Sequence, residues 1–160
     1  MWFDNLFKKF NHKNNNKDDK NYIKKDNLEN KANINIGCDL VVDDSDPNRV
    51  VIKRYLSLFG RNTDEATNGQ EALNKIEEGD KLNTYDIIWM DIQMPRMNGI
   101  KCTNYLRNEL KYTGTIIGLT GHVDAGTISD CEKAGMNAIL PKPIEKNVLR
   151  AYIDKYKHIE

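Results

Sequence analysis

Three acidic residues stand where two short apolar runs end. Asp43 and Asp44 follow the run LVV at 40–42, and Asp91 follows the run IIWM at 87–90. Short apolar runs of this kind are typical of buried strands in a parallel sheet, and such sheets bind ligands at the carboxyl ends of their strands. We therefore expect the three carboxylates to meet at one edge of a sheet.

Two later strand ends carry Thr120 and Lys142. Carboxylates can hold a hard cation, and one of them can accept a phosphoryl group, whereas a hydroxyl and an ammonium can bind phosphoryl oxygens. An acidic pair after a strand is, taken alone, more often a solvated turn or a helix cap. The combination of these residue types at strand ends is what favours phosphoryl-transfer chemistry.

Alternating strand-like and helix-like patterns must position these residues. The expected strands are residues 36–42, 63–66, 85–90, 115–120 and 137–140. The expected helices are residues 47–59, 69–78, 99–110, 125–134 and 145–156. Asp46 is expected to cap the first helix, with Pro47 in its first turn. Residues 63–66 are polar for a buried strand, so the second strand is the least clear of the five.

Five such βα units predict an α/β fold with a doubly wound, flavodoxin-like parallel sheet in the order 2-1-3-4-5. In that order strands one and three are neighbours, so Asp43, Asp44 and Asp91 converge. Two like charges about 4 Å apart cost roughly 4 kcal/mol at an effective dielectric near 20, so protons or a divalent ion must be present. An oxygen site with few protein ligands suits Mg²⁺.

Four stretches of the chain carry a family resemblance. They are DLVVDDSDPNRV, YDIIWMDIQMPRMNG, TIIGLTGH and AGMNAILPKPI, and they run in order from about Asp39 to Ile144. They resemble the receiver domain of two-component response regulators. The motifs MDIQMPRMNG and LTGH are most similar to those in the receivers of hybrid histidine kinases, and this similarity favours a phosphorelay role.

The resemblance implies a Mg²⁺ site. Asp44 and Asp91 would bind the ion directly, and the main-chain carbonyl of Gln93 would supply another ligand. Asp43 would act mainly through water.

The resemblance also implies the roles of the remaining site residues. Asp91 would be the phosphoacceptor, attacking a phosphohistidine donor in line. Lys142 and Thr120 would bind the phosphoryl oxygens, and a cis peptide bond before Pro143 would aim the lysine inward. The chain would then catalyse only its own phosphorylation and dephosphorylation.

Signalling would follow from a conformational change. In the family, a threonine at the position of Thr120 moves toward the phosphoryl group and the following loop moves with it. An aromatic residue usually follows that motion three positions before the lysine, but this position is Ile139 here. His122 is either a solvent-facing loop residue or, with Gln93, a group at the pocket mouth that tunes hydrolysis.

The partner implied by the resemblance is a histidine kinase or a histidine phosphotransfer protein. A homodimer through the face of the fourth helix, fifth strand and fifth helix stays open. One alternative is a pseudo-receiver that binds partners without phosphorylation, but three repelling acids would then serve no purpose. Another is a haloacid-dehalogenase-like phosphatase, whose DxD motif would stand on the first strand, whereas here the acid of interest is on the third.

Composition sets broad limits on the 160-residue chain. Residues 1–36 hold eight Lys and five acidic residues, and residues 37–160 hold sixteen Lys or Arg and nineteen acidic residues, so their charges are about +3 and −3. A mildly acidic domain argues against direct nucleic-acid binding. Three scattered cysteines form no metal motif and favour a reducing, cytoplasmic compartment.

The chain is expected to divide into residues 1–35 and a receiver domain at 36–160. Residues 1–10 carry an apolar face at helical spacing, which could rest on a membrane or a partner, fold back on the domain or fray. Residues 11–35 are rich in Asn, Lys and Asp and are expected to be a disordered linker. The chain ends directly after the fifth expected helix, so no output domain is expected.

Overall fold

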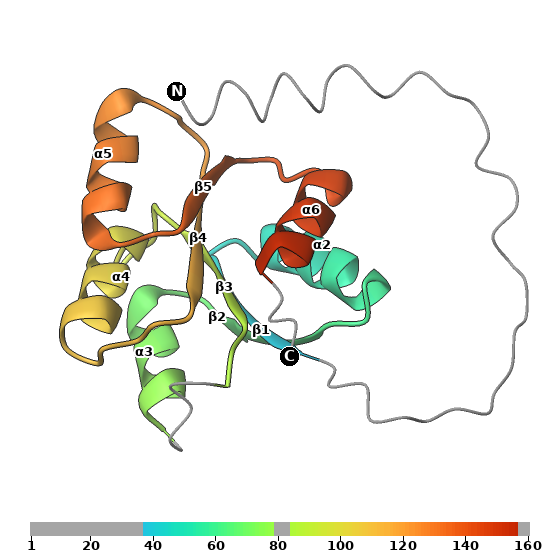
Figure 1. The fold of residues 1–160 in the computed structure, drawn as a ribbon, viewed down its shortest axis with the longest axis horizontal. Coiled ribbons are helices and arrows are strands. Elements are labelled where there is room, and N and C mark those ends of the chain that lie inside the picture. The colour runs from blue at the N-terminus through green and yellow to red at the C-terminus, as the bar shows by residue number, and fades with distance from the viewer. Residues whose placement is uncertain (1–36, 79–83, 157–160) are drawn as a thin grey trace, which may run out of the picture. The chain divides into compact units, whose positions relative to one another are not determined.

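The computed structural model describes residues 37–78 and 84–156 of the chain. Their strands form a single parallel sheet in the order β2-β1-β3-β4-β5, which confirms the predicted topology (Figure 1). The strands are β1 (Cys38–Val42), β2 (Asn62–Ala66), β3 (Ile87–Asp91), β4 (Thr115–Thr120) and β5 (Ala138–Pro141). The helices are α2 (Asp46–Leu58), α3 (Gly69–Glu77), α4 (Gly99–Asn108), α5 (Ala125–Ala134) and α6 (Lys146–Tyr156).

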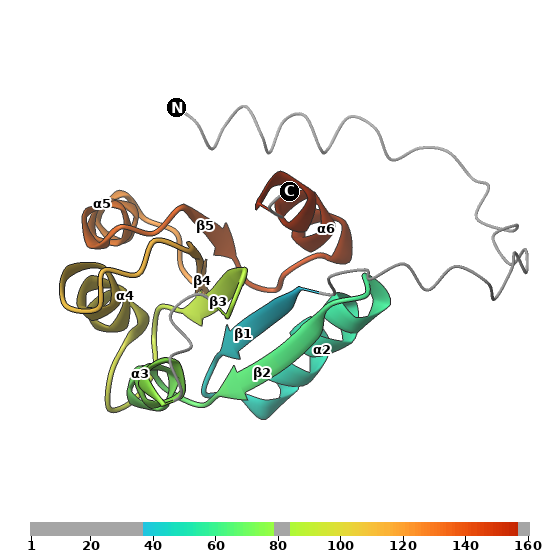
Figure 2. The ribbon, with the colours of Figure 1, turned by 60° about the horizontal axis from the view of Figure 1, so that its bottom comes forward.

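Helices cover both faces of the sheet. Figures 1 and 2 show α2 and α6 on one face and α3, α4 and α5 on the other. Because side chains alternate along a strand, Val41 and Trp89 pack with α2 and α6, where Leu56 and Leu149 are also fully buried. Burial on both faces explains why the central strands have continuous apolar sequences instead of alternating ones.

The second strand forms despite its polar sequence, because β2 is an edge strand that pairs only with β1 among the described strands. Its residues are exposed or half-buried except Ala66, which is fully buried. Polar and charged side chains on an edge strand also discourage pairing with another chain.

The start of the first helix differs from the expectation. Asp46 does not cap α2 but is its first residue, and Ser45 is the N-cap residue, without a side-chain capping bond. The carboxylate of Asp46 does not cap the helix because it pairs with Arg49, one turn further along α2. The other expected elements are present; β4 and α5 have the expected bounds, and the ends of the rest differ by at most two residues.

Some expectations lie outside the described residues. The amphipathic segment at 1–10 and the linker at 11–35 are among them, and the domain boundary at residue 36 stays a prediction. Among residues 37–78 and 84–156, no helix has the length and apolar character needed to cross a membrane.

Candidate functional site

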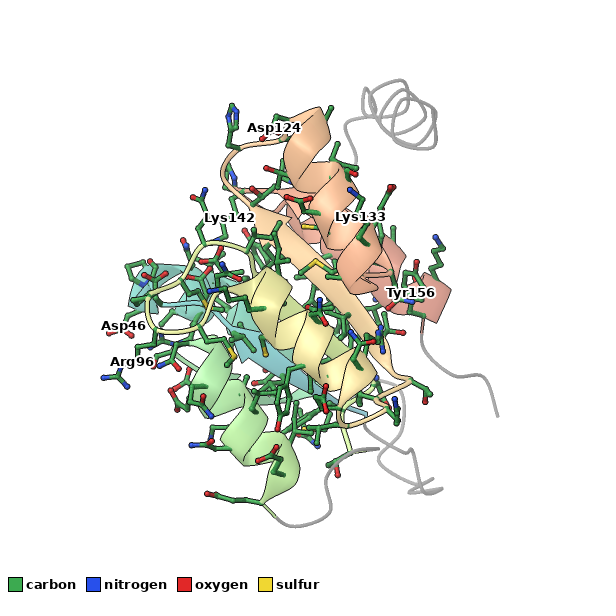
Figure 3. All side chains as sticks on the ribbon, turned by 90° about the vertical axis from the view of Figure 1, so that its left-hand side faces the viewer. Asp46, Arg96, Asp124, Lys133, Lys142 and Tyr156 are labelled. Carbon is green, nitrogen blue, oxygen red and sulfur yellow. The ribbon has the colours of Figure 1, made fainter. Side chains whose placement is uncertain are left out.

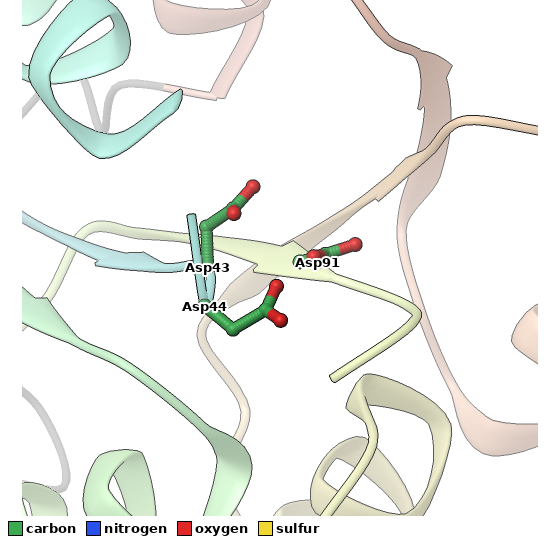
Figure 4. A group of neighbouring side chains, drawn as sticks. All are labelled: Asp43, Asp44 and Asp91. Carbon is green, nitrogen blue, oxygen red and sulfur yellow. The ribbon is translucent and has the colours of Figure 1, made fainter. Parts of the chain in front are cut away.

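Three carboxylates meet at the carboxyl edge of the sheet. Asp43 and Asp44 follow β1, and Asp91 is the last residue of β3, which pairs with β1. One carboxylate oxygen from each residue lies within 4.8 Å of the other two (Figure 4). The predicted convergence is therefore confirmed.

Lys142 joins this cluster from the loop after β5. Its ammonium lies 2.7 Å from Oδ2 of Asp43 and 2.9 Å from Oδ2 of Asp91. Its backbone N–H also donates to the carbonyl of Thr120 at 2.7 Å, and the peptide bond to Pro143 is cis, as expected. Burial alone lowers the pKa of Lys142, but its bonds to the two carboxylates outweigh burial and raise the pKa.

The carboxylate of Asp43 is buried and has several hydrogen-bond donors around it. The Ser45 N–H donates to Oδ1 at 2.8 Å, and the Asn48 side-chain amide lies 3.3 Å from Oδ1 and 3.2 Å from Oδ2. Lys142 adds its ammonium to Oδ2. Asp44 is exposed instead, so its carboxylate is the more accessible of this pair.

Asp91 is almost fully buried, with 3 % of its surface exposed. Burial raises the pKa of Asp91, and the charge of Asp43 adds to this, while Lys142 opposes it. The Gln93 N–H donates to Oδ1 of Asp91 at 3.2 Å, which orients the carboxylate. Asp91 is thus a buried carboxylate that faces one cation and two acids.

Thr120 ends β4, the strand next to β3, but its hydroxyl is engaged locally. It donates to the carbonyl of His122 at 2.7 Å and accepts from the His122 N–H at 3.1 Å. The His122 side chain is 80 % exposed and lies 3.8 Å from the Asp124 carboxylate, as a solvent-facing loop residue would. Ile139 is buried in β5 opposite Gly118.

A surface pocket opens beside the acids. Asp44 and Gln93 line it together with Met94 and Pro95 of the loop after β3, and Thr127 and Asp130 of α5 complete its far side. Arg96 of the same loop has a left-handed backbone with φ of 64° and extends outward (Figure 3). The exposed carboxylate of Asp44 therefore lies at the wall of an open pocket.

Two residues of the site were missed by the sequence reasoning. Asn48 bonds the Asp43 carboxylate, and the buried guanidinium of Arg49 donates through Nη1 to the Asp43 main-chain carbonyl at 2.7 Å. The available signal was their place in the first helical turn after an acidic pair, where polar side chains can reach back to the strand end.

The donor set fits a hard divalent cation. Three carboxylates within 4.8 Å of one another supply the oxygen ligands that Mg²⁺ prefers, and the Lys142 ammonium compensates only part of their charge. The absence of sulfur or imidazole groups from this set argues against zinc or copper as the preferred ion.

Comparisons with known proteins agree with this geometry. The family model described as the response regulator receiver domain matches residues 40–154. The osmosensing histidine protein kinase SLN1 of Saccharomyces cerevisiae is 39% identical over 134 residues, which cover 82% of this chain and 11% of that protein. The two-component response regulator 24 of Arabidopsis thaliana is 36% identical over 116 residues, which cover 72% of this chain and 81% of that protein.

A solved structure gives the same result. A crystal structure of a CheX-CheY-BeF3-Mg²⁺ complex from Borrelia burgdorferi contains a chain that aligns with a TM-score of 0.69 at 26% identity, covering 76% of this chain and 90% of that one. The present chain spans only about a tenth of SLN1. Sequence, fold and site together show that the chain belongs to the response regulator receiver domain family, the phosphoacceptor domains of two-component phosphorelays.

Proposed function

We propose that Asp91 is the phosphoacceptor of this receiver domain. The observation that carries the proposal is the placement of Asp91, a buried carboxylate at the end of β3 with the Lys142 ammonium 2.9 Å from its Oδ2. The opening beside Asp44 and Gln93 gives a donor access to this edge of the sheet.

The reaction needs little from the protein beyond placement and charge. An oxygen of Asp91 attacks the phosphorus of a phosphohistidine, the new O–P bond forms as the P–N bond breaks, and the departing imidazole nitrogen keeps the electron pair and takes up a proton. Lys142 lies where it can bind a phosphoryl oxygen. Hydrolysis of the resulting acyl phosphate returns Asp91 to its carboxylate, so the chain catalyses only changes to itself.

We further propose that the acids hold Mg²⁺ during this reaction. Asp44, Asp91 and the main-chain carbonyl of Gln93 would be its direct ligands, because the lone pairs of Asp43 are already occupied by Ser45, Asn48 and Lys142. Asp43 would therefore act through water. When bound, the ion supplies positive charge against the phosphoryl oxygens.

The response to phosphorylation would begin at Thr120. Its hydroxyl is bonded to the His122 carbonyl, so binding a phosphoryl oxygen requires that bond to break and the loop at 121–124 to rearrange. Ile139 lacks the ring that usually accompanies this movement, so the signal would leave through the loop and α5.

The proposed donor is a histidine kinase or a histidine phosphotransfer protein in the cytoplasm. The likeness to histidine kinase SLN1 supports a phosphorelay. A homodimer through α5, β5 and α6, and a membrane contact by residues 1–10, stay predictions. The pseudo-receiver alternative has no observation in its favour.

Intact mass spectrometry tests the proposal. The full chain is incubated with phosphoramidate, a small donor with a P–N bond, with and without Mg²⁺. We expect a gain of one phosphoryl group that requires Mg²⁺ and is lost in Asp91→Asn. A folded wild-type protein that gains nothing under either condition would support the pseudo-receiver instead.

A further inference from the structure

A buried cation lies directly behind the acidic pair. Arg49 is in the first turn of α2, and only 7 % of its surface is exposed. Its Nη1 donates to the main-chain carbonyl of Asp43 at 2.7 Å. That carbonyl belongs to the peptide group that joins Asp43 to Asp44, the exposed carboxylate of the site.

The bond from Arg49 is one of several that fix Asp43, the residue that follows β1. The Asp43 N–H donates to the carbonyl of Ala66 in β2 at 3.1 Å, and the Asp43 side chain is bonded by Ser45, Asn48 and Lys142. The remaining carbonyl of Asp43 accepts from Arg49. With these groups fixed, the direction in which the Asp44 side chain leaves the backbone is fixed as well.

Arg49 is itself anchored on its other side. Its guanidinium pairs with Asp46, and its Nε lies 3.5 Å from Oε2 of Glu65 in β2. The same Glu65 oxygen accepts from Lys53 at 2.9 Å. The guanidinium therefore bonds the turn that carries the acids through Asp43 and Asp46, and faces Glu65 of the edge strand in an ion pair without a hydrogen bond from Nε. A planar guanidinium held by two such bonds has a defined position.

We propose that Arg49 is a positioning residue of the cation site, which acts through the Asp43 carbonyl to aim the Asp44 carboxylate and touches neither the cation nor the phosphoryl group. The inference rests on the proposed function, because it concerns the Mg²⁺ site of that reaction. Groups that orient metal ligands in this way typically change metal affinity 10- to 100-fold when removed.

The sign of the effect separates positioning from simple electrostatics. A fixed positive charge beside the site repels Mg²⁺, so its removal should tighten binding if charge were its only contribution. If Arg49 positions Asp44, its removal should weaken binding although the repulsion is gone.

Isothermal titration calorimetry with MgCl₂ on the full chain decides between these outcomes. We expect Arg49→Met to weaken Mg²⁺ binding about 10-fold or more, and Arg49→Lys, which keeps the charge but not the fork, to weaken it by a smaller factor. The matched control is Lys53→Met, which removes a cation from the same Glu65 but not from the Asp43 carbonyl, and should leave the affinity within about two-fold. Circular dichroism and urea unfolding without Mg²⁺ show that each variant is folded.

Arg49→Lys carries the test if Arg49→Met does not fold. Folded Arg49 variants that bind Mg²⁺ as tightly as the wild type, or more tightly, would overturn the inference. In that case wild-type binding that is lost in Asp44→Asn would still leave the proposed function standing. A wild-type chain that binds no Mg²⁺ would contradict both the positioning role of Arg49 and the proposed function.

Discussion

Lys142 is shared between two acids and cannot neutralise the site. Three ionised carboxylates and one ammonium add to a net charge of −2 (−3 + 1) in a small volume. One divalent cation would balance that charge. In the absence of a cation, burial raises the pKa of Asp91, and the negative charge of Asp43 adds to this effect.

Asp91→Asn is therefore expected to stabilise the metal-free protein near neutral pH. The folded pKa of Asp91 lies above its ordinary value of 3.8, mainly because of burial, so the folded state disfavours its charge. The stability associated with this group is fully present below pH 3.8 and is lost as pH rises through the raised folded pKa. We expect a gain on the order of 1 kcal/mol at pH 7.

Urea unfolding of the wild type and of Asp91→Asn, from below pH 3.8 to pH 7 and in the presence of a chelator, measures the difference in their free energies of unfolding. The advantage of Asp91→Asn should shrink as pH falls through the folded pKa of Asp91. An advantage that grows on acidification would show that Lys142 outweighs burial.

Lys142→Met should have the opposite effect on stability. It leaves Asp43 and Asp91 buried without their shared cation. Breaking a fully buried pair costs about 3–5 kcal/mol, and we expect a smaller loss here because the Lys142 side chain is partly exposed. Thermal unfolding without Mg²⁺ should show a lower midpoint, and added Mg²⁺ should recover more stability in this variant than in the wild type. A midpoint equal to that of the wild type would mean that the ammonium contributes no net stabilisation.

At the scale of elements, one arginine fastens α4 to the loops around it. Arg107 donates through Nε to the carbonyl of Gly135 at 3.0 Å, and through Nη1 to the carbonyls of Tyr112 at 2.6 Å and Gly114 at 2.8 Å. Its Nη2 reaches Oδ1 of Asn137 at 2.9 Å. This one side chain satisfies backbone groups at the end of α5 and before β4.

Arg107→Met should lower the free energy of unfolding by about 3 kcal/mol, because several carbonyls lose a charged donor together. Lys101→Met on the exposed side of the same helix is the control and should change stability by less than about 0.5 kcal/mol. Urea denaturation measures both. Equal effects of the two substitutions would contradict the assignment of Arg107 as a structural anchor.

The elements themselves were predictable wherever burial determines sequence. The apolar runs of β1, β3 and β4 predicted strands that are covered on both faces. The acids that follow β1 and end β3 predicted that the site lies at the carboxyl edge of the sheet. The ends of elements were less predictable because side-chain bonds decide them. Asp46 is of a residue type that often caps helices, yet its carboxylate pairs with Arg49 and Ser45 occupies the N-cap position.

The site was predictable in its strand-end residues but not in their support. Asp43, Asp44, Asp91 and Lys142 meet as their positions implied. The position of Arg49 in the first helical turn after the acidic pair was a signal that it could reach back to the strand end, but residue type and spacing do not say that its partner is a main-chain carbonyl. The local bond between Thr120 and His122 was likewise invisible, because it depends on the path of a short loop.

At the scale of the whole molecule, the two edges of the sheet hold charge differently. At the amino edge, the buried Asp39 accepts from Arg61 at 2.5 Å and from the Trp89 indole at 3.2 Å, and Arg61 also donates to Asp86 at 2.7 Å. Each of these three charged residues has a partner of opposite sign. The carboxyl edge instead carries an excess of acid that a ligand can satisfy.

Mg²⁺ should therefore stabilise the whole domain through that one edge. Binding to the folded state alone adds about 2.7 kcal/mol when the ion is present at 100 times its dissociation constant. Differential scanning fluorimetry should show a midpoint that rises with Mg²⁺ concentration, and Asp44→Asn should abolish the rise. Asp130→Asn, which removes another acid from the lining of the neighbouring pocket, should retain it. Loss of the rise in both variants would indicate diffuse electrostatic binding.

Locating the phosphoryl group on the chain tests directly whether Asp91 is the phosphoacceptor. After reaction with phosphoramidate and Mg²⁺, borohydride reduces an aspartyl phosphate to homoserine, and peptide mass spectrometry identifies the altered position. We predict homoserine at position 91 and at no other aspartate. Homoserine at position 43 or 44, or at none, would contradict the assignment of Asp91 as the phosphoacceptor.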